Sequence, residues 1–430
     1  MKSHKHPLVN STMSVDGGTW ARSRHVSPVE TWLIKRLMGL MGDPAVSILF
    51  WDGREHYRCP HAQPVGCIRL LDRATLWRLL TNPTLNFGDS FSAGRIQVEG
   101  DLVGLIHAVY DAKVRRSRPG ALQALIKGRV IRSQCNSLSD SRYNIVHHYD
   151  LGNDFYRLWL DDEMAYTCAY FPDPHMTLEQ AQAAKLDHVA RKLQLRPGEQ
   201  VVEAGCGWGG LARHFARHYG VHVRAYNISP SQIAYARQRA QAEGLEDRVE
   251  YIEDDYRNIR GKYDVFVSVG MLEHVGARNY RTLGRVIDRA LKDDGRGLIH
   301  SIGQNRPEPL SAWTVKRIFP GAYAPTLGQM MEIFETPGFS VVDVENLRLH
   351  YAKTLEHWLA RYERHADKAR RMFDDFFVRA WRLYLSASIA SFRAGCLQLY
   401  QVVFTRPSKN DMAWTRAHLY QDQPPPQSGA

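Results

Sequence analysis

One stretch decides the fold of this 430-residue chain: Val201-Val202-Glu203-Ala204-Gly205-Cys206-Gly207-Trp208-Gly209-Gly210. Its apolar first half predicts a buried strand, and its glycines predict a tight turn leading into a helix over residues 211–219. Glycine at such a turn lets a bound ligand approach the backbone closely. Gly205, Gly207 and Gly210 also satisfy the pattern of dinucleotide-binding loops, so the motif alone does not identify the ligand.

The residues around the turn favour S-adenosylmethionine over a nicotinamide dinucleotide. Nicotinamide enzymes of the common kind carry an acidic residue after the second strand, whereas here that strand ends at Tyr226-Asn227. Glu203 instead lies immediately before the turn, where S-adenosylmethionine enzymes commonly place a carboxylate near the cofactor's amino-acid end. Asp255 and Tyr256, after the third strand, offer an acceptor for the adenine amino group and a ring to stack on it. An exposed loop tyrosine is the simpler alternative for Tyr256.

The segment around the turn predicts an α/β catalytic domain over residues 142–420. Short apolar runs alternate with longer helical periodicities, which indicates a parallel sheet with helices on both faces. The predicted strands are residues 200–204, 222–227, 249–252, 265–269, 297–301, 339–344 and 397–404. Two helical insertions, residues 303–335 and 355–393, are longer than plain crossovers, and we expect them to cover a substrate pocket.

The N-terminal part predicts a small α+β domain over residues 29–132. Helical periodicity marks residues 29–41, 76–80 and 102–112, and strand-like patterns mark residues 46–51, 57–68 and 94–100. Residues 1–28 are predicted to be a flexible N-terminus and residues 133–141 a linker. Residues 421–430, which are polar and proline-rich, are predicted to be a disordered tail.

The net charge of +11 predicts attraction to an anionic partner, either nucleic acid or an anionic lipid surface. The densest basic patch comprises Lys113, Arg115, Arg116, Arg118, Lys127, Arg129 and Arg132. The six cysteines form neither a metal-binding set nor a disulfide framework, so no metal site is expected. No apolar run is long enough to cross a bilayer and residues 1–14 do not resemble a secretion signal, which favours a cytoplasmic location.

Several further motifs point to a family. They are His148-Tyr149-Asp150-Leu151-Gly152-Asn153, Thr167-Cys168-Ala169-Tyr170-Phe171, Gly270-Met271-Leu272-Glu273-His274-Val275-Gly276, His300-Ser301-Ile302-Gly303 and Phe392-Arg393-Ala394-Gly395. From about Tyr143 to Thr405 the chain resembles the cyclopropane-fatty-acyl-phospholipid synthases. The resemblance implies a Rossmann-like class I methyltransferase domain with helical insertions, preceded by a small α+β lipid-binding domain. It also implies a homodimer that acts on membrane phospholipid at the inner face of an anionic bilayer, without a nucleic-acid partner.

The implied reaction transfers a methylene from S-adenosylmethionine to a cis double bond of an acyl chain, through a carbocation that bound bicarbonate deprotonates. The resemblance assigns the bicarbonate site to Cys168, Glu273, His300, the backbone of Ile302, and Tyr351. The expected cofactor residues are Tyr166, Thr167, Glu203, Gly205, Gly207, Gly209, Asn227, Ile228, Gln232, Asp255 and Tyr256. Asn227 stands where threonine is usual in the family.

Aromatic faces such as those of Tyr170, Phe171 or Tyr323 could stabilise the carbocation, although these residues could equally be plain core. The main alternative function is a related C-methyltransferase that leaves a methyl branch or a methylated alkene, because the fold would be the same. A second alternative is a lipid-binding or lipid-transfer protein without catalysis. Nucleic-acid methylation ranks last, because the Asn/Asp-Pro-Pro-aromatic signature of exocyclic amine methylases is absent from the sequence.

Overall fold

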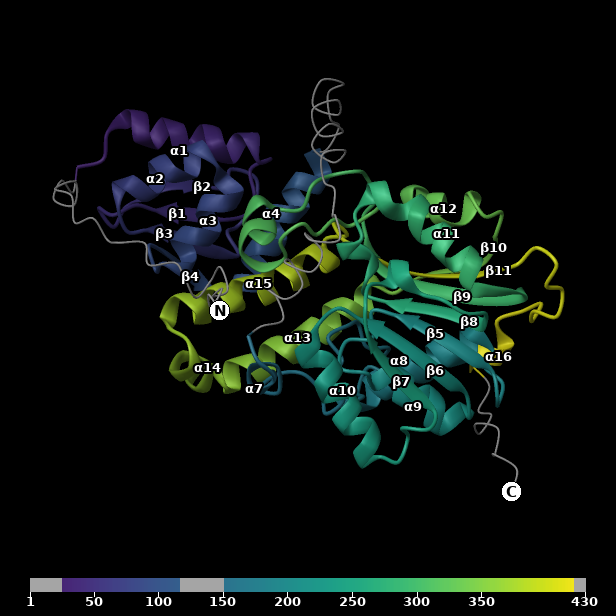
Figure 1. Cartoon of the computed structure of the whole chain (residues 1–430). Helices are drawn as coiled ribbons and strands as arrows, with labels where there is room; N and C mark the ends of the chain where they lie inside the picture. Colours follow the sequence, from purple (N-terminus) through teal and green to yellow (C-terminus); the bar gives the residue numbers. More distant parts are fainter. Residues whose placement is uncertain (1–24, 117–150, 421–430) are drawn as a thin grey trace. The chain divides into compact units, whose positions relative to one another are not determined.

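The computed structural model of the chain describes residues 25–116 and 151–420 (Figure 1). The chain forms two compact units, each built from segments that lie far apart in sequence. Unit 1 comprises Met1–Lys127, Pro309–Pro320 and Leu355–Leu397, and unit 2 comprises Gly128–Glu308, Gly321–Thr354 and Gln398–Ala430. The predicted linker, the predicted tail, residues 1–24 and most of the basic patch lie outside the described residues, so those predictions stay untested.

Unit 1 contains a four-stranded sheet with the strand order β2-β1-β3-β4. Strand β1 pairs antiparallel with β2 and parallel with β3, and β3 pairs antiparallel with β4. The strands are β1 (Ser47–Leu49), β2 (Glu55–Arg58), β3 (Gly66–Leu70) and β4 (Ile96–Gly100). The helices are α1 (Pro28–Leu40), α2 (Arg73–Thr81), α3 (Pro83–Ser92), α4 (Leu102–Arg116), the π-helical turn η5 (Thr314–Ile318), α14 (Ala366–Met372) and α15 (Asp375–Arg393).

Two predictions for this unit were wrong in detail. The single strand predicted over residues 57–68 is two strands, β2 and β3, and Pro60 and Pro64 lie between them, where proline cannot donate a ladder hydrogen bond. Helix α3 was not predicted. It begins with proline at its first turn, and the side chain of Asn82 caps it by accepting from Leu85 N at 3.2 Å, which is a recognisable start signal.

The two helical insertions were predicted to belong wholly to the domain over residues 142–420, but the structure divides them between the two units. Their segments 309–320 and 355–397 group with unit 1, where α15 packs against α3 and α4. The Arg317 guanidinium binds the Asp89 carboxylate at 3.0 and 2.9 Å, and Arg379 Nε donates to the Ser92 carbonyl at 2.7 Å. A Cβ added at Gly88 would lie 2.4 Å from the Trp313 ring, so this indole requires glycine beneath it. That the insertions also cover a pocket stays a prediction.

Unit 2 contains a seven-stranded sheet with the order β10-β11-β9-β8-β5-β6-β7. The strands are β5 (Gln200–Ala204), β6 (His222–Asn227), β7 (Val249–Glu253), β8 (Tyr263–Val269), β9 (Leu291–Gly303), β10 (Ser340–Asn346) and β11 (Gln398–Thr405). The predicted parallel sheet is confirmed for β5, β6, β7, β8 and β9, but β11 runs antiparallel to both β9 and β10. Every residue of β11 is buried, and a buried apolar run carries no signal of strand direction.

Helices cover both faces of this sheet, as predicted (Figure 1). They include α8 (Leu178–Leu193), α9 (Gly210–Tyr219), α10 (Pro230–Ala242), α11 (Tyr280–Ala290) and α12 (Leu327–Glu335). The remaining helices are α7 (Asn153–Tyr156), η2 (Tyr256–Asn258), η3 (Leu272–His274), η4 (Ala277–Asn279), α13 (Arg348–Arg364) and α16 (Ala417–Tyr420). The boundary between the two units falls within α13. Among the described residues, no helix combines the length and apolarity that a membrane span requires.

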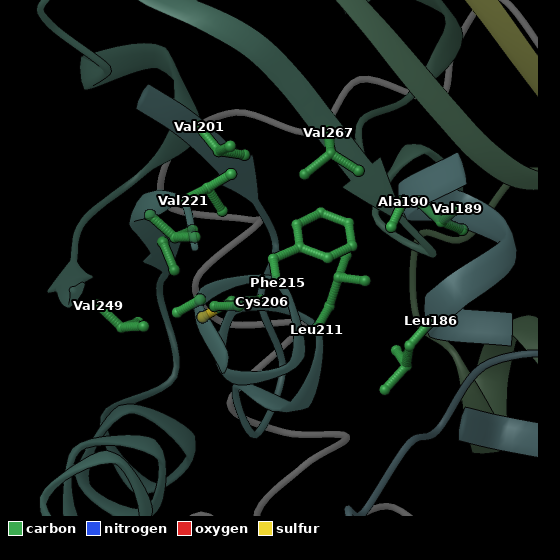
Figure 2. Packing of buried hydrophobic residues seen from close by; sticks show 14 of the residues in the cluster. Leu186, Val189, Ala190, Val201, Cys206, Leu211, Phe215, Val221, Val249 and Val267 are labelled. Atoms are coloured by element: carbon green, nitrogen blue, oxygen red, sulfur yellow. The ribbon is translucent and has the colours of Figure 1, made fainter. Parts of the chain in front are cut away.

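The core of unit 2 forms two apolar clusters, because successive strand residues point to opposite faces. Val201 belongs to the cluster with α8 and α9, whereas Val202 belongs to the cluster with α11 and α12. Figure 2 shows the Phe215 ring of α9 between Val201, Val267 and Leu211. The glycine turn therefore starts from a strand that is buried on both sides.

We expect Phe215→Leu to lower the free energy of unfolding by about 1–3 kcal/mol, because leucine leaves part of the ring's volume empty. Phe215 is fully buried in the cluster. Urea unfolding measures the change, and Val342→Ala, at a half-exposed position of β10, is the matched control. Equal stabilities of the two variants would contradict the placement of Phe215 in the core.

Candidate active site

A pocket in unit 2 lies at the carboxyl ends of β5, β6 and β8, the edge where open α/β sheets bind ligands. The predicted cofactor residues that line it are Tyr166, Thr167, Glu203, Gly205, Gly207, Asn227 and Gln232. Gly209, Ile228, Asp255 and Tyr256 are not among its lining residues. Residues that the sequence reasoning missed also line it, namely Glu163, Met164, Ala165, Lys185, Leu186, Cys206, Trp208, Gly210, Leu211, Val269, Gly270, Met271 and His274.

The glycine turn is held by backbone hydrogen bonds and positive φ angles. The amides of Gly205 and Cys206 both donate to the carbonyl of Tyr226, at 2.9 and 3.1 Å. Gly205 has a φ of +86°, and a Cβ placed there would lie 2.9 Å from Cβ of Met271. A Cβ at Gly207, with a φ of +53°, would meet nothing within 4 Å. The turn thus offers open backbone on the pocket side.

Gly209 has a packing role instead. Its φ is +82°, and the hydroxyl of Tyr251 donates to its carbonyl at 2.7 Å. A Cβ at Gly209 would lie 2.4 Å from that hydroxyl oxygen. Any larger residue at position 209 would therefore collide with Tyr251. Gly209 is not among the residues that line the pocket, so the predicted cofactor contact has no support there.

Asn227 ties the turn to the start of α10. Its Nδ2 donates to the Gly207 carbonyl at 3.2 Å and to Gln232 Oε1 at 2.8 Å, and its Oδ1 accepts from Ser229 N at 3.3 Å. Each polar atom of the asparagine side chain has a partner. These bonds explain how asparagine can occupy a position where threonine is usual in the family.

Asp255 and Tyr256 have local partners. The Asp255 carboxylate accepts from Arg257 N at 2.9 Å and lies 3.6 Å from the Arg257 guanidinium, whose Cζ is 5.1 Å from the centre of the Tyr256 ring. Tyr256 is 7% exposed, so the alternative of an exposed loop tyrosine was wrong. Their contact with an adenine ring stays a prediction.

Glu203 and Glu163 are the acidic residues that line the pocket, and Glu163 pairs with Arg213 and Arg239. Glu203 is the more buried of the two. Its carboxylate is buried at the end of β5, and Oε2 has no hydrogen-bond partner among the described residues. Burial raises the pKa of Glu203 to about 8, against the opposing effect of Lys185 and Arg213. A buried acceptor without a partner is costly, so a cationic ligand group would stabilise it.

Glu273 and Ile302, two of the predicted bicarbonate residues, are in direct contact. Glu273 Oε1 accepts from Ile302 N at 2.6 Å, and Glu273 Oε2 has no partner in the described part of the chain. Burial raises the pKa of Glu273 to about 7. His300 lies two residues before Ile302 on β9, so both point to the same face of the sheet. Gln401 contacts His300 Nδ1 at 3.1 Å, and burial lowers the pKa of His300 to about 3.

Cys168 and Tyr351 lie beside Thr354 rather than in direct hydrogen-bond contact with Glu273. The Cys168 thiol donates to the Ala169 carbonyl at 3.1 Å, and Ala169 N donates to Thr354 Oγ1 at 3.0 Å. Tyr351 is buried one helical turn before Thr354 on α13. Burial raises the pKa of the Cys168 thiol, which keeps it protonated and unsuited to nucleophilic attack.

A series of contacts through Gly270 links the segment around Cys168 to the segment around Glu273. A Cβ at Gly270 would lie 2.9 Å from Cγ2 of Thr167, the neighbour of Cys168. Gly270 N donates to the carbonyl of His300 at 2.9 Å. Glu273 follows three residues later. The motif around Thr167 and the motif around Glu273 therefore meet at Gly270, which also lines the pocket.

The aromatic residues considered for cation stabilisation have partners of their own. Tyr170 stacks on His188 at a centroid distance of 4.1 Å, and the Lys353 ammonium lies 5.4 Å from the centre of the Phe171 ring. The Tyr323 hydroxyl donates to Gln329 Oε1 at 2.8 Å. Phe171 and Tyr323 are buried, which agrees with the alternative that they are packed core, whereas Tyr170 is half-buried.

We expect Glu203→Gln to remove a pH dependence of stability from the ligand-free protein. The pKa of Glu203 rises from an ordinary 4.5 to about 8 on folding, so the folded state holds this proton more tightly than the unfolded state. The wild type therefore loses stability as pH rises from about 5 to 8, by roughly 3–4 kcal/mol from this group.

Urea unfolding at pH 5 and pH 8 measures this loss, which should be smaller in Glu203→Gln than in the wild type. The exposed Glu246 gives the matched control, because Glu246→Gln should retain the wild-type difference. A wild-type difference in Glu203→Gln would contradict the raised pKa.

Residues 136–402 match a family model described as mycolic acid cyclopropane synthetase, and residues 33–118 match a domain of unknown function. A probable fatty acid methyltransferase of Pseudomonas putida is 36% identical over 385 residues, which cover 86% of this chain and 95% of that relative. The cyclopropane-fatty-acyl-phospholipid synthase of Escherichia coli strain K12 is 41% identical over 270 residues, 63% of this chain and 69% of that enzyme.

Solved structures agree with these matches. The cyclopropane synthase MmaA2 from Mycobacterium tuberculosis is 29% identical, with a TM-score of 0.60, and the alignment covers 63% of this chain and all of that one (100%). The mycolic acid cyclopropane synthase CmaA1, complexed with SAH and CTAB, is 30% identical with a TM-score of 0.59, over 61% of this chain and 98% of that one. Both alignments extend over more than half of the present chain.

Proposed function

The chain belongs to the mycolic acid cyclopropane synthetase family and is an S-adenosylmethionine-dependent methyltransferase with a class I fold, and from this we propose that it cyclopropanates membrane phospholipid. The proposed reaction adds a methylene across a cis double bond of an acyl chain. The 41% identity to the Escherichia coli phospholipid enzyme supports this substrate class. The net charge of +11 supports an anionic bilayer as the partner surface. We also propose a homodimer, as the resemblance implies.

The pocket suits S-adenosylmethionine. Glu203 Oε2, which has no partner in the part of the chain that the structure describes, suits a cationic amino group, and the open side of the turn at Gly207 leaves room for a ligand against the backbone. When bound, this cofactor supplies an electrophilic methyl group. Thr167, Glu203 and Gln232 would bind and orient it from three different elements of unit 2.

The observation that carries the ring-forming proposal is the buried Glu273 carboxylate, whose Oε1 accepts from Ile302 N while its Oε2 has no partner among the described residues. An alkene gives up no proton before it is methylated, so ring closure needs a base close to the new methyl group. We propose that Glu273 Oε2 accepts a hydrogen bond from bicarbonate, which would serve as that base. Ile302 N already donates to Glu273, so its predicted bond to bicarbonate would require Glu273 to release it.

A second candidate function has support from the relative that covers most of this chain. The Pseudomonas putida protein carries the name probable fatty acid methyltransferase, and it aligns with 86% of the chain. A methyl-branched or methylated-alkene product would need the same cofactor pocket. The two functions differ only in the fate of the cation after methyl transfer.

Mass spectrometry separates the two functions. The purified protein is incubated with S-adenosylmethionine and vesicles of anionic phospholipid bearing cis-unsaturated chains, with and without bicarbonate, and the released fatty acids are analysed. We expect a mass gain of one CH2 in a product that resists hydrogenation and fragments as a cyclopropane, with a yield that depends on bicarbonate. A methyl branch would support the second function, and the absence of any product would overturn both.

A further inference from the structure

Lys185 is a buried cation that lines the cofactor pocket. The proposed reaction assigns it no role. It lies on α8, is 3% exposed, and lines the pocket together with Thr167 and Glu203. Its Nζ donates to Thr167 Oγ1 at 2.9 Å. No carboxylate in the described part of the chain forms an ion pair with it. An ammonium group has three donor positions, so this single bond leaves its charge without a matched partner.

The surroundings of Lys185 make this position costly. Burial lowers the pKa of Lys185, and the nearby Asp161, Cys168 and Glu203 act in the opposite direction. A buried charge normally persists only where it has a partner. By contrast Lys192, two turns later on the same helix, binds Glu345 Oε2 at 2.6 Å and lies outside the pocket lining. Two buried lysines on one helix thus differ in whether a protein carboxylate neutralises them.

The pocket therefore presents an acid and a base whose hydrogen-bonding capacity is incompletely used. Glu203 has one oxygen without a partner among the described residues, and Lys185 has a neutral hydroxyl as its hydrogen-bond partner. They come from different elements, the end of β5 and the inner face of α8. A zwitterionic ligand would satisfy both at once, because its ammonium would suit Glu203 and its carboxylate would suit Lys185.

We propose that Lys185 binds the α-carboxylate of the cofactor's methionyl end, opposite Glu203, and so selects a zwitterionic amino-acid group. Thr167, which already accepts from Lys185, would donate its hydroxyl proton to the same carboxylate and hold the lysine in place. The inference rests on the S-adenosylmethionine dependence of the enzyme and not on the identity of the lipid product. Its failure would therefore leave the proposed cyclopropanation standing.

A competing role for Lys185 is structural, in which its bond to Thr167 maintains the shape of the pocket. The two roles predict opposite effects on a ligand that has the amine but lacks the carboxylate. If Lys185 binds a carboxylate, its removal cannot weaken such a ligand, and the lost positive charge would favour the amine. If Lys185 only maintains the shape of the pocket, its removal weakens every ligand alike.

The test measures the binding of three ligands to Lys185→Met by isothermal titration calorimetry. They are S-adenosylhomocysteine, its decarboxylated analogue, which keeps the amine, and methylthioadenosine, which lacks both charged groups. We expect the affinity for S-adenosylhomocysteine to fall about 10- to 100-fold, as for the loss of a charged hydrogen bond, while the affinities for the other two ligands do not fall. Lys185→Gln, which keeps a donor for Thr167 without the charge, should show an intermediate loss.

Lys192→Met is the matched control and should retain all three affinities, because that lysine lies outside the pocket lining. Thermal unfolding establishes that each variant is folded at the temperature of the titration. If Lys185→Met destroys the fold, Lys185→Gln carries the comparison of the three ligands. Wild-type affinity for S-adenosylhomocysteine in either folded Lys185 variant, or an equal loss for all three ligands, would overturn the proposal.

Discussion

Glu273→Gln should lose about 10³-fold in product formation while its affinity for S-adenosylhomocysteine stays unchanged. Glutamine has the shape of glutamate, but it replaces one of two acceptor oxygens by an NH2 group. In the wild type, Oε1 accepts from Ile302 N at 2.6 Å, and the buried Oε2 has no partner within residues 25–116 and 151–420. An amide cannot serve both positions as an acceptor, so either the bond to Ile302 or the acceptor proposed for bicarbonate is lost.

Initial rates of fatty acid conversion, together with calorimetric binding of S-adenosylhomocysteine, measure the two quantities separately. Glu335→Gln is the control, because Glu335 is exposed at the end of α12 and its loss should leave the rate unchanged. Wild-type turnover by Glu273→Gln would remove this residue from the site. An equal loss of rate and of cofactor affinity would show that the substitution damages the pocket and not the proton transfer.

Gly205→Val should abolish cofactor binding, with a loss of more than about 10³-fold in the affinity for S-adenosylhomocysteine, because two penalties act together. A β-branched residue at a φ of +86° is strained wherever it occurs. The new Cβ would also lie 2.9 Å from Cβ of Met271, which lines the same pocket. The turn must then shift away from the position in which Gly205 and Cys206 donate to the Tyr226 carbonyl.

The control for this variant is Gly198→Val. Gly198 precedes β5 with a φ of +83°, but a Cβ there would meet nothing within 4 Å. It shares the backbone strain and lacks the collision, so it should lose some stability and keep its affinity for S-adenosylhomocysteine. Calorimetry and thermal unfolding of both variants separate the two penalties. Comparable affinities in the two variants would show that contact with Met271 does not shape the pocket.

The strands that carry the cofactor turn could be predicted closely from the sequence. Strands β5 and β6 have the predicted bounds, because each is a short apolar run that ends at a glycine or at a capped helix start. The contact between Glu273 and Ile302 could be anticipated only in part. Strand order brings their two segments to one sheet edge, but the hydrogen bond between them depends on a side-chain conformation.

Other features left little trace in the sequence. Lys185 lies on the buried face of α8 between Ala181 and Val189, but Gln182, His188 and Lys192 are buried on the same helix, so a charged residue at this spacing did not mark a site by itself. The true role of Gly209 depends on the Tyr251 hydroxyl, which comes from a strand far along the chain. Likewise, the grouping of α15 with α3 and α4 depends on long-range packing that no local pattern encodes.

The interleaved construction of unit 1 has a consequence for synthesis. Helices α3 and α4 leave the ribosome within the first segment of that unit, whereas α15 becomes complete only with the segment that ends at Leu397. At translation rates of about 5–20 residues per second, the N-terminal segment waits for tens of seconds before its packing partner exists. During that interval apolar side chains such as Phe91, Leu105 and Ile106 lack part of their final environment. We therefore expect the nascent chain to be most prone to aggregation before α15 is synthesised. Slower elongation over the catalytic strands should then prolong the exposure of the surfaces of α3 and α4 that α15 covers.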